Sequence, residues 1–160
     1  MALALNFSPL GMSGCEPEMN AKQLEPGTWA LVFEKGDEPI SQLERFAKEQ
    51  RLTSASFSAI GAFSSAVLGY FDRERKGYEE IEVEEQVEVL TLLRDVAVHE
   101  GEPKIHTHVV LRKRDGSAVG GHLLRAQVWP TLELVLRESR AKLRKRHDPE
   151  TGLALIDPLL

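Results

Sequence analysis

Three of the five histidines in this chain lie close together, between residues 106 and 122. His106 and His108 are two residues apart in a mostly apolar segment, residues 104–111, and His122 follows a pair of glycines. Residues two apart in a β-strand point to the same face, so the first two imidazoles would share one face and the apolar side chains the other. Two imidazoles on one face can bind one metal ion. A third from the next strand would complete a three-nitrogen site.

The turn between the two strands decides whether His122 can join this pair. If Asp115-Gly116 forms a two-residue turn, His108 lies opposite Leu123 and His122 points away, because a one-residue slip reverses every side chain. If residues 114–116 form a three-residue loop, glycine takes the last position, where positive φ is needed, and His108 lies opposite His122. Cross-strand partners have Cβ atoms about 5 Å apart, close enough for joint ligation. Both registers are open at the level of sequence, and we favour the second.

The expected metal follows from the ligand types. Three neutral imidazoles without cysteine suit zinc, nickel, cobalt or iron, and zinc is the divalent ion we expect. Three protein ligands leave one coordination position open, as in catalytic zinc sites. In an enzyme the ion would polarise a carbonyl group or lower the pKa of a bound water. The sequence identifies no general base, for which Glu133 and His99 are the only candidates. Half-buried, hydrogen-bonded histidines without a metal are the alternative.

A ligand pocket is expected beside His122. Gly120 and Gly121 carry no side chains, so they would leave the open position of the metal accessible to a small carboxylate, phosphate or similar anion. Arg94 lies among apolar residues of a strand and needs a partner there. We interpret it either as an ion-paired residue or as part of the anion pocket.

Composition limits the class of protein. A chain of 160 residues with 42% hydrophobic residues indicates a single domain with a core, and we expect a flexible tail over residues 1–24 and one domain over residues 25–157. No stretch approaches the roughly 20 apolar residues of a membrane span. The first residues lack the basic region of a signal peptide, and Cys15 is the only cysteine, so we expect a cytoplasmic location. The net charge of −5 argues against indiscriminate nucleic-acid binding.

Periodicity predicts one helix and many strands. Residues 29–33 are typical of a strand, and residues 38–50 of an amphipathic helix that Asp37 could cap, with Pro39 in its first turn. The acidic segment Glu79–Glu88 is expected as a solvated edge strand. Runs rich in Val, Leu and Ile predict further strands at residues 55–62, 66–72, 78–84, 87–99, 104–113, 118–128 and 132–137.

A basic segment follows, between Arg137 and His147. It is either a nucleic-acid or phosphate patch, or a solvated segment paired with the acidic strand of the same chain or of a neighbouring one. No aromatic residue interleaves it, so base stacking has no support. The candidate contact residues are Arg140, Lys142, Arg144, Lys145 and Arg146.

An ordered set of motifs resembles the PPC family, also called PCC or DUF296, over about residues 26–157. The domain follows AT-hook motifs in plant proteins and usually stands alone in bacteria and archaea. The resemblance implies an α/β fold of the α+β type, with a mostly antiparallel sheet packed with a helix and assembled as a homotrimer. It also implies a metal site at His106, His108 and His122. The matching motifs are Gly36-Asp37, Ile60–Phe63, Leu68–Asp72, Ile105–His108, Asp115-Gly116, Gly120–Leu123 and Thr131–Glu133.

The same family resemblance raises the question of whether this chain binds DNA. Bacterial members are often described as DNA-binding by analogy with the plant proteins, but this chain lacks the Arg-Gly-Arg-Pro core of an AT-hook. The plant domain itself is thought to mediate association between proteins. We therefore expect a metal-dependent binder or enzyme for a small anion first. A DNA-associated assembly module is the second hypothesis and a trimer without chemistry the third. We expect neither tight, sequence-specific DNA binding nor a membrane role.

Overall fold

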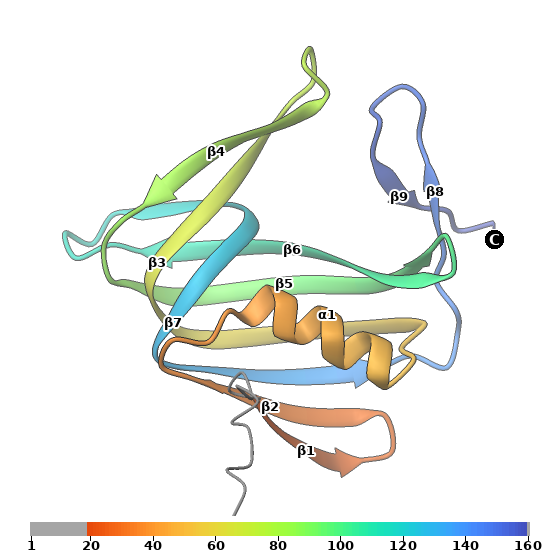
Figure 1. The fold of residues 1–160 in the computed structure, drawn as a ribbon, viewed down its shortest axis with the longest axis horizontal. Coiled ribbons are helices and arrows are strands. Elements are labelled where there is room, and N and C mark those ends of the chain that lie inside the picture. Colours follow the sequence, from red (N-terminus) through yellow and green to blue (C-terminus); the bar gives the residue numbers. More distant parts are fainter. Residues whose placement is uncertain (1–18, 160) are drawn as a thin grey trace, which may run out of the picture.

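The computed structural model describes residues 19–159, and β-structure dominates this part of the chain (Figure 1). Most strands belong to one antiparallel sheet, and a single short hairpin pairs on its own. The elements are β1 (Asn20–Glu25), β2 (Thr28–Glu34), α1 (Pro39–Glu49), β3 (Ser54–Asp72), β4 (Gly77–Val83), β5 (Val87–His99), β6 (Glu102–Arg112), β7 (Ala118–Glu138), β8 (Lys145–His147) and β9 (Ala154–Ile156).

The expected mostly antiparallel sheet with one helix is confirmed, but two pairs of predicted strands are single strands. Residues 54–72 form one strand, β3, and residues 118–138 form another, β7. The register of β3 against β7 shifts between Gly61 and Phe63 and again between Phe63 and Ser65. Such bulges bend a strand without ending it, which is why small residues that look like a turn lie inside β3.

The predicted tail and domain boundary differ from the structure at residues 20–24. These residues belong to β1, which pairs with β2 from Asn20 opposite Val32 to Glu25 opposite Thr28. The apolar residue Met19 packs against the core. The rest of the predicted tail, residues 1–18, lies outside the described residues.

The sheet closes on itself because β3 and β7 each pair with more than one neighbour. Its order is β1-β2-β7-β6-β5-β3-β4, with an additional β7–β3 pairing. Strands β7, β6, β5 and β3 therefore form a closed circuit. β7 pairs with β6 only over residues 118–122 and then leaves it to follow β3. The histidines of β6 and β7 lie at the point where the two strands separate.

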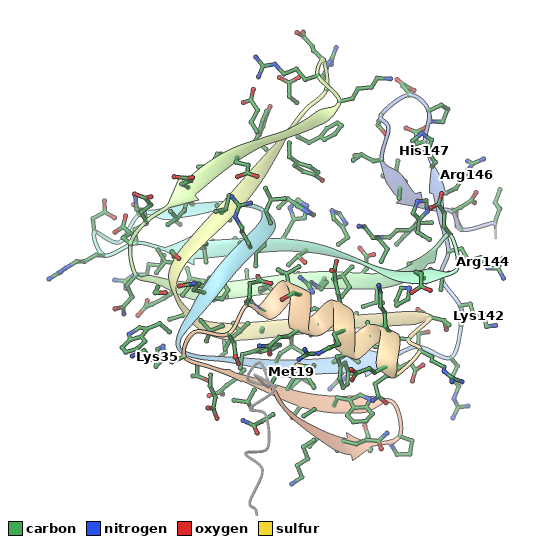
Figure 2. The ribbon with its side chains drawn as sticks, in the orientation of Figure 1. Met19, Lys35, Lys142, Arg144, Arg146 and His147 are labelled. Atoms are coloured by element: carbon green, nitrogen blue, oxygen red, sulfur yellow. The ribbon has the colours of Figure 1, made fainter. Side chains whose placement is uncertain are left out.

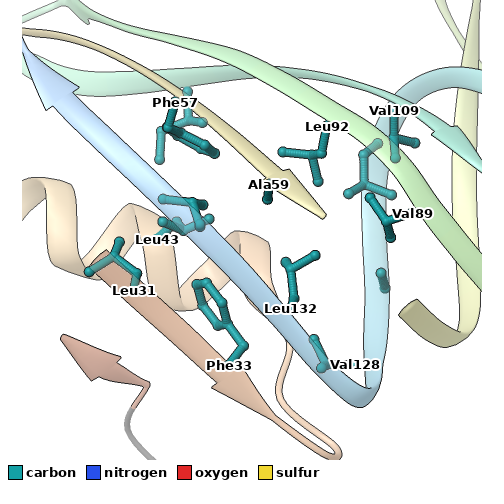
Figure 3. Close-up of a cluster of buried hydrophobic side chains, with 14 of the residues drawn as sticks. Leu31, Phe33, Leu43, Phe57, Ala59, Val89, Leu92, Val109, Val128 and Leu132 are labelled. Atoms are coloured by element: carbon teal, nitrogen blue, oxygen red, sulfur yellow. The ribbon is translucent and has the colours of Figure 1, made fainter. Parts of the chain in front are cut away.

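One core fills the inside of this circuit and the space under α1 (Figure 3). Phe33 and Phe63 have no exposed surface, and Leu132 of β7 is equally buried. The helix contributes Leu43 and Phe46, which recur at helical spacing and face the sheet. Burying a side chain of this size contributes about 1.5–3 kcal/mol, so the core stabilises the strand pairing that positions the histidines.

The helix begins one residue later than expected, and a different residue caps it. Glu38 accepts a hydrogen bond from the backbone N–H of Ser41 at 2.7 Å. Asp37 is buried and instead accepts bonds from the backbone N–H of Glu34 at 2.8 Å and from Gln42 Nε2 at 3.0 Å. Asp37 thus fixes the turn before the helix, while Glu38 satisfies an N–H of its first turn.

The acidic segment lies at an edge, as expected. β4 is the last strand in the order of the main sheet, and its residues Glu79, Glu80 and Glu82 are exposed. Charged side chains on an edge strand discourage pairing with another chain. No helix within residues 19–159 is long and apolar enough to cross a membrane.

A substitution at Gly61 tests the close approach of β3 and β7. A Cβ at this position would collide with the backbone O of Thr131 and lie 2.8 Å from Leu132 Cα, and φ is +154°. We expect Gly61→Ala to lower the free energy of unfolding by about 2–3 kcal/mol, because neither strand can give way without breaking the core. Urea denaturation measures this. Gly77→Ala is the matched control, since its nearest neighbour is 3.9 Å away, and it should change stability by less than about 0.5 kcal/mol. Equal stability of the two variants would contradict the packing.

Candidate metal centre

The β6–β7 hairpin adopts the three-residue loop. The N–H of Lys113 donates to the carbonyl O of Ser117 at 2.8 Å, and the N–H of Gly116 donates to the carbonyl O of Lys113 at 3.0 Å. Gly116 has φ +87°, the conformation that favoured glycine at this position. His108 therefore pairs directly with His122. The register that brings the third histidine onto the face of the first two is the one the structure contains.

The three imidazoles converge. Nε2 of His106 and Nε2 of His108 lie 3.2 Å apart, close to the roughly 3.3 Å that separates two ligands of a tetrahedral ion with bonds of about 2.0–2.1 Å. One nitrogen of each ring lies within 4.8 Å of the others. The rings of His106 and His122 are stacked at 5.3 Å between centroids. This donor set fits a divalent ion that prefers nitrogen ligands.

Burial favours the neutral form of two of these imidazoles, those of His108 and His122. Burial lowers the pKa of His122 to about 4, with further lowering by His106, His108, Arg94 and Lys145. Burial also lowers the pKa of His108, and His106 adds to the effect. Nδ1 of His122 is buried without a hydrogen-bond partner among residues 19–159. Because a metal binds only the deprotonated nitrogen of an imidazole, neutral rings are ready to act as ligands.

The carboxylate of Asp95, in β5, lies within hydrogen-bonding distance of the His106 imidazole. Its Oδ2 lies 3.3 Å from Nδ1 of His106, so that nitrogen can donate to the carboxylate and leave Nε2 free for a metal. Its Oδ1 forms an ion pair with Nζ of Lys145 at 2.8 Å, and the lysine side chain is only 3% exposed. A metal-ligating histidine held by a carboxylate is the usual outer-shell arrangement.

Tyr78 of β4 fixes the third ring. It stacks on His122 with ring centroids 4.7 Å apart and an interplanar angle of 22°. The tyrosine can lie flat across β3 because Gly69 is beneath it: a Cβ there would be 2.7 Å from Tyr78 Cδ1. Burial raises the pKa of the Tyr78 hydroxyl, so the group is a neutral hydrogen-bond donor at the edge of the site.

A cavity of about 450 Å³ adjoins the triad. His106 and His122 line it, together with Asp95, Lys145 and Tyr78. Its other wall is apolar and comes from α1, β7 and the β8–β9 hairpin. The volume lies within the range of about 300–1,000 Å³ typical of sites for small molecules.

Comparison with known proteins agrees with this architecture. Residues 23–140 match the model of the Plants and Prokaryotes Conserved (PCC) domain. The chain belongs to the PCC family. The resemblance predicted from the ordered motifs is thereby confirmed. No curated protein matches the chain.

Solved structures share the fold of this PCC domain over most of both chains. A metal-containing protein from Archaeoglobus fulgidus is 36% identical, covers 87% of this chain and 96% of its own, and has a TM-score of 0.72. A plant- and prokaryote-conserved protein from Pyrococcus horikoshii is 25% identical, with coverage of 91% and 99% and a TM-score of 0.75. A candidate DNA-binding protein from Bacteroides thetaiotaomicron is 25% identical, with coverage of 88% and 98% and a TM-score of 0.83.

Arg94 lies elsewhere in the PCC domain than the pocket expected for it. It pairs with Thr107, and both side chains are buried on the core side of the sheet, whereas His106 and His108 point outward. Its guanidinium lies 4.8 Å from the ring centroid of Phe57, and its nitrogens have no hydrogen-bond partner among residues 19–159. Burial lowers the pKa of Arg94 to about 9, while Glu44, Glu38 and Asp95 oppose that shift. Arg94 is not among the residues that line the cavity.

Gly120 and Gly121 lie where another part of the backbone approaches closely. A Cβ on Gly120 would lie 2.8 Å from the carbonyl O of Val109, and one on Gly121 would lie 3.2 Å from the carbonyl O of Gly69. They allow backbones to approach, and neither glycine is among the residues that line the cavity. Glu133 and His99, the candidate bases, do not line it either.

The basic segment does not form one free patch. Lys145 is buried against Asp95, and Nε of Arg146 lies 3.1 Å from Oδ2 of Asp157. Figure 2 shows the side chains of Lys142, Arg144 and Arg146 following the C-terminal segment along one edge of the molecule. Arg140, Lys142 and Arg144 stay exposed. Two of the five cations thus pair with acidic residues, but their partners are Asp95 and Asp157 and not the acidic strand that was expected.

Sequence reasoning missed Asp95, Tyr78 and the buried role of Lys145. For Asp95 the sequence did hold a signal, because Gly101 lies in the short link between two predicted strands and favours a tight turn. In the structure Glu100 and Gly101 both have positive φ and form a two-residue turn that pairs His99 with Glu102. Counting back along that hairpin places Asp95 opposite His106. Nothing local marks Tyr78 or Lys145, whose contacts join distant parts of the chain.

The histidine environment predicts an unusual titration. In metal-free protein we expect His122 to remain neutral at pH 6 and to protonate with a midpoint near 4, below its ordinary value of 6.5. The unfolded chain takes up this proton first as the pH falls, so His122 lowers the free energy of unfolding between about pH 6.5 and 4. Nitrogen chemical shifts of the imidazoles, measured by NMR in folded and urea-unfolded protein, report both values. A folded-state midpoint at or above 6.5 would contradict the burial.

Proposed function

We propose that this PCC-family protein binds one divalent metal ion, zinc, through His106, His108 and His122, and that the open coordination position takes a small anionic ligand. The observation that carries the proposal is the convergence of three imidazoles, two of which, those of His106 and His122, line a cavity. The relative from Archaeoglobus fulgidus is described as metal-containing, which supports the same role for this chain. When bound, the ion would supply positive charge that polarises an oxygen ligand.

The side chains around the triad have distinct parts in this function. Asp95 would hold the Nδ1 proton of His106 and thereby fix its tautomer. Lys145 would balance the charge of Asp95 within the protein. Tyr78 would keep the ring of His122 in place by stacking and would offer its hydroxyl to a ligand in the cavity. These roles suffice for binding of a ligand.

We also propose that the protein assembles as a homotrimer. The outward face of the sheet beside the triad carries exposed apolar side chains: Ile60 is 63% exposed, Leu93 58% and Val135 42%. Leu93 pairs with His108 on one side and with Ser58 on the other, and Ser58 also pairs with Val135, so these residues share one face. A contiguous apolar face of this kind suits contact between subunits.

A DNA-associated role is the second function considered. It has the support of the similar protein from Bacteroides thetaiotaomicron, described as a candidate DNA-binding protein. Arg140, Lys142 and Arg144 remain exposed and could contact phosphate groups. Three cations on an acidic protein favour weak and unspecific contact over recognition of a sequence.

Removing one ligand or its support tests the metal site. With Co²⁺ as a spectroscopic probe and protein purified without a polyhistidine tag, we expect one bound ion per subunit. Asp95→Asn should weaken binding by about 10–100-fold, because it replaces the charged acceptor of the His106 proton by a neutral and weaker one. His106→Ala should weaken binding further. His147→Ala is the control, since this exposed histidine lies outside the triad. Equal affinity in all four proteins would overturn the proposal.

The assembly is tested by light scattering. We expect a mass three times that of the 17.9 kDa subunit at micromolar concentration. Ile60→Glu should shift the protein toward the subunit mass, because it places a charge in the proposed apolar contact. Wild-type protein at the subunit mass would refute the trimer.

DNA binding is tested through its salt dependence. We expect weak binding to duplex DNA without preference between a sequence and its scrambled form. If contact is made by the three exposed cations of the basic segment, Arg140, Lys142 and Arg144, the affinity should fall with salt along a double-logarithmic slope of about −3. Fluorescence anisotropy at several salt concentrations measures this. Nanomolar binding to one sequence at physiological salt would favour the DNA-associated role.

A further inference from the structure

The C-terminal hairpin, β8–β9, forms one wall of the cavity beside the histidines. Leu153, Leu155 and Ile156 line this wall, and Lys145 lies at its base. The match to the PCC domain ends at residue 140, so the hairpin follows the matched region. Metal ligands and cavity wall thus come from different parts of the chain.

Hydrogen bonds and an ion pair hold the β8–β9 hairpin against the rest of the structure. Within it, the N–H of Asp148 donates to the carbonyl O of Leu153 at 2.8 Å, and the hydroxyl of Thr151 donates to Oδ2 of Asp148 at 2.6 Å. At its base, the N–H of Val98 in β5 donates to the carbonyl O of Leu143 at 2.8 Å. The Lys145–Asp95 ion pair adds a link to the residue that supports His106. A wall with these attachments is present before any ligand arrives.

The tip of the hairpin meets the opposite hairpin. Both β3–β4 and β8–β9 project from the same side of the sheet (Figure 1). Nζ of Lys76, in the β3–β4 turn, donates to the carbonyl O of Pro149 at 3.2 Å. Tyr78 of β4 and Leu155 of β9 both line the cavity, so the two hairpins bound it from two sides.

Two apolar residues of the wall, adjacent in β9, keep exposed surface. Leu155 is 46% exposed and Ile156 43%, although both line the cavity. Ile40 of α1 and Leu124 of β7 contribute more apolar lining. Removing such surface from water is favourable in proportion to its area, so a ligand with a hydrocarbon body would be stabilised here.

The charges of the lining nearly cancel. Lys145 is paired with Asp95, and the two remaining charged residues, Lys104 and Glu44, have opposite signs. The two positive charges of an ion held by three neutral histidines would therefore lack compensation, which favours an anionic ligand. A monocarboxylate fits both the positive charge of the ion and the apolar lining of the cavity, because one end is an oxygen anion and the rest can be hydrocarbon.

We propose that the site binds a small monocarboxylic acid with a hydrocarbon body, and that the β8–β9 hairpin selects this ligand through Leu155 and Ile156. The proposal rests on the metal site proposed above. The carboxylate would take the open coordination position, and the hydrocarbon would lie against the hairpin.

The experiment uses full-length protein loaded with Co²⁺ and titrated with acetate, butanoate and hexanoate, followed by the change in the Co²⁺ absorption spectrum. We expect affinity to rise about fourfold for each added methylene that enters the apolar wall. In the double variant Leu155→Ala with Ile156→Ala, the gain per methylene should fall below about twofold, while the affinities for Co²⁺ and for acetate stay unchanged. Leu159→Ala is the matched control, since Leu159 is 92% exposed and does not line the cavity.

A second variant tests the wall by charge. Leu155→Glu should weaken butanoate binding at least tenfold without loss of Co²⁺, because a carboxylate would repel the ligand and remove its apolar contact. Failure of the wild-type protein to bind Co²⁺ would overturn both the metal site and this proposal. Co²⁺ binding with equal affinity for the three acids would overturn only the ligand. A gain per methylene that survives in both hairpin variants would overturn the role of the hairpin.

Discussion

The pairing of His108 with His122 across the β6–β7 hairpin is the constraint on which the candidate site depends. Three features hold it: the positive φ of Gly116 in the loop, and the burial of Leu111 and Leu123 on the other face of the same two strands. A slip of one residue would turn His122 inward and expose Leu123, at a cost of about 1.5–3 kcal/mol for that side chain alone. The core and the convergence of the three histidines therefore depend on the same register.

The closed circuit of strands explains why the site is accessible even though it adjoins the core. β7 stays with β6 only as far as His122 and then turns to β3, so the edge of β6 from Lys104 to Thr107 is left without a strand neighbour. α1 and the β8–β9 hairpin approach this edge, and the cavity lies between them. The three histidines are thus on well-supported strands, while the open side of the candidate site faces a gap in the sheet. Rigid support with open access suits a binding site.

The features of the site that depend on neighbouring residues could be predicted from the sequence. The features that depend on contacts between distant segments could not. The spacing of His106 and His108 fixed a shared face, and glycine at position 116 favoured the correct loop, because both depend on a few neighbouring residues. The burial of Arg94 beneath α1 and of Lys145 against Asp95 depends on packing between segments far apart in the chain. For the same reason, β3 was expected as two strands: its continuity comes from pairing with β7 through bulges, which no local signal shows.

Lys145 shows how a residue of a basic segment can support the candidate metal site instead of a surface that binds nucleic acid. Burying its ammonium group without a partner would be costly, and the carboxylate of Asp95 offsets that cost. The same carboxylate faces His106, so one acidic residue joins the C-terminal segment to a candidate metal ligand. Any substitution at Asp95 would then act on two parts of the chain at once: the tautomer of His106, and the anchorage of the hairpin that forms the cavity wall. Residues within the PCC domain and residues beyond it are thereby coupled through a single side chain.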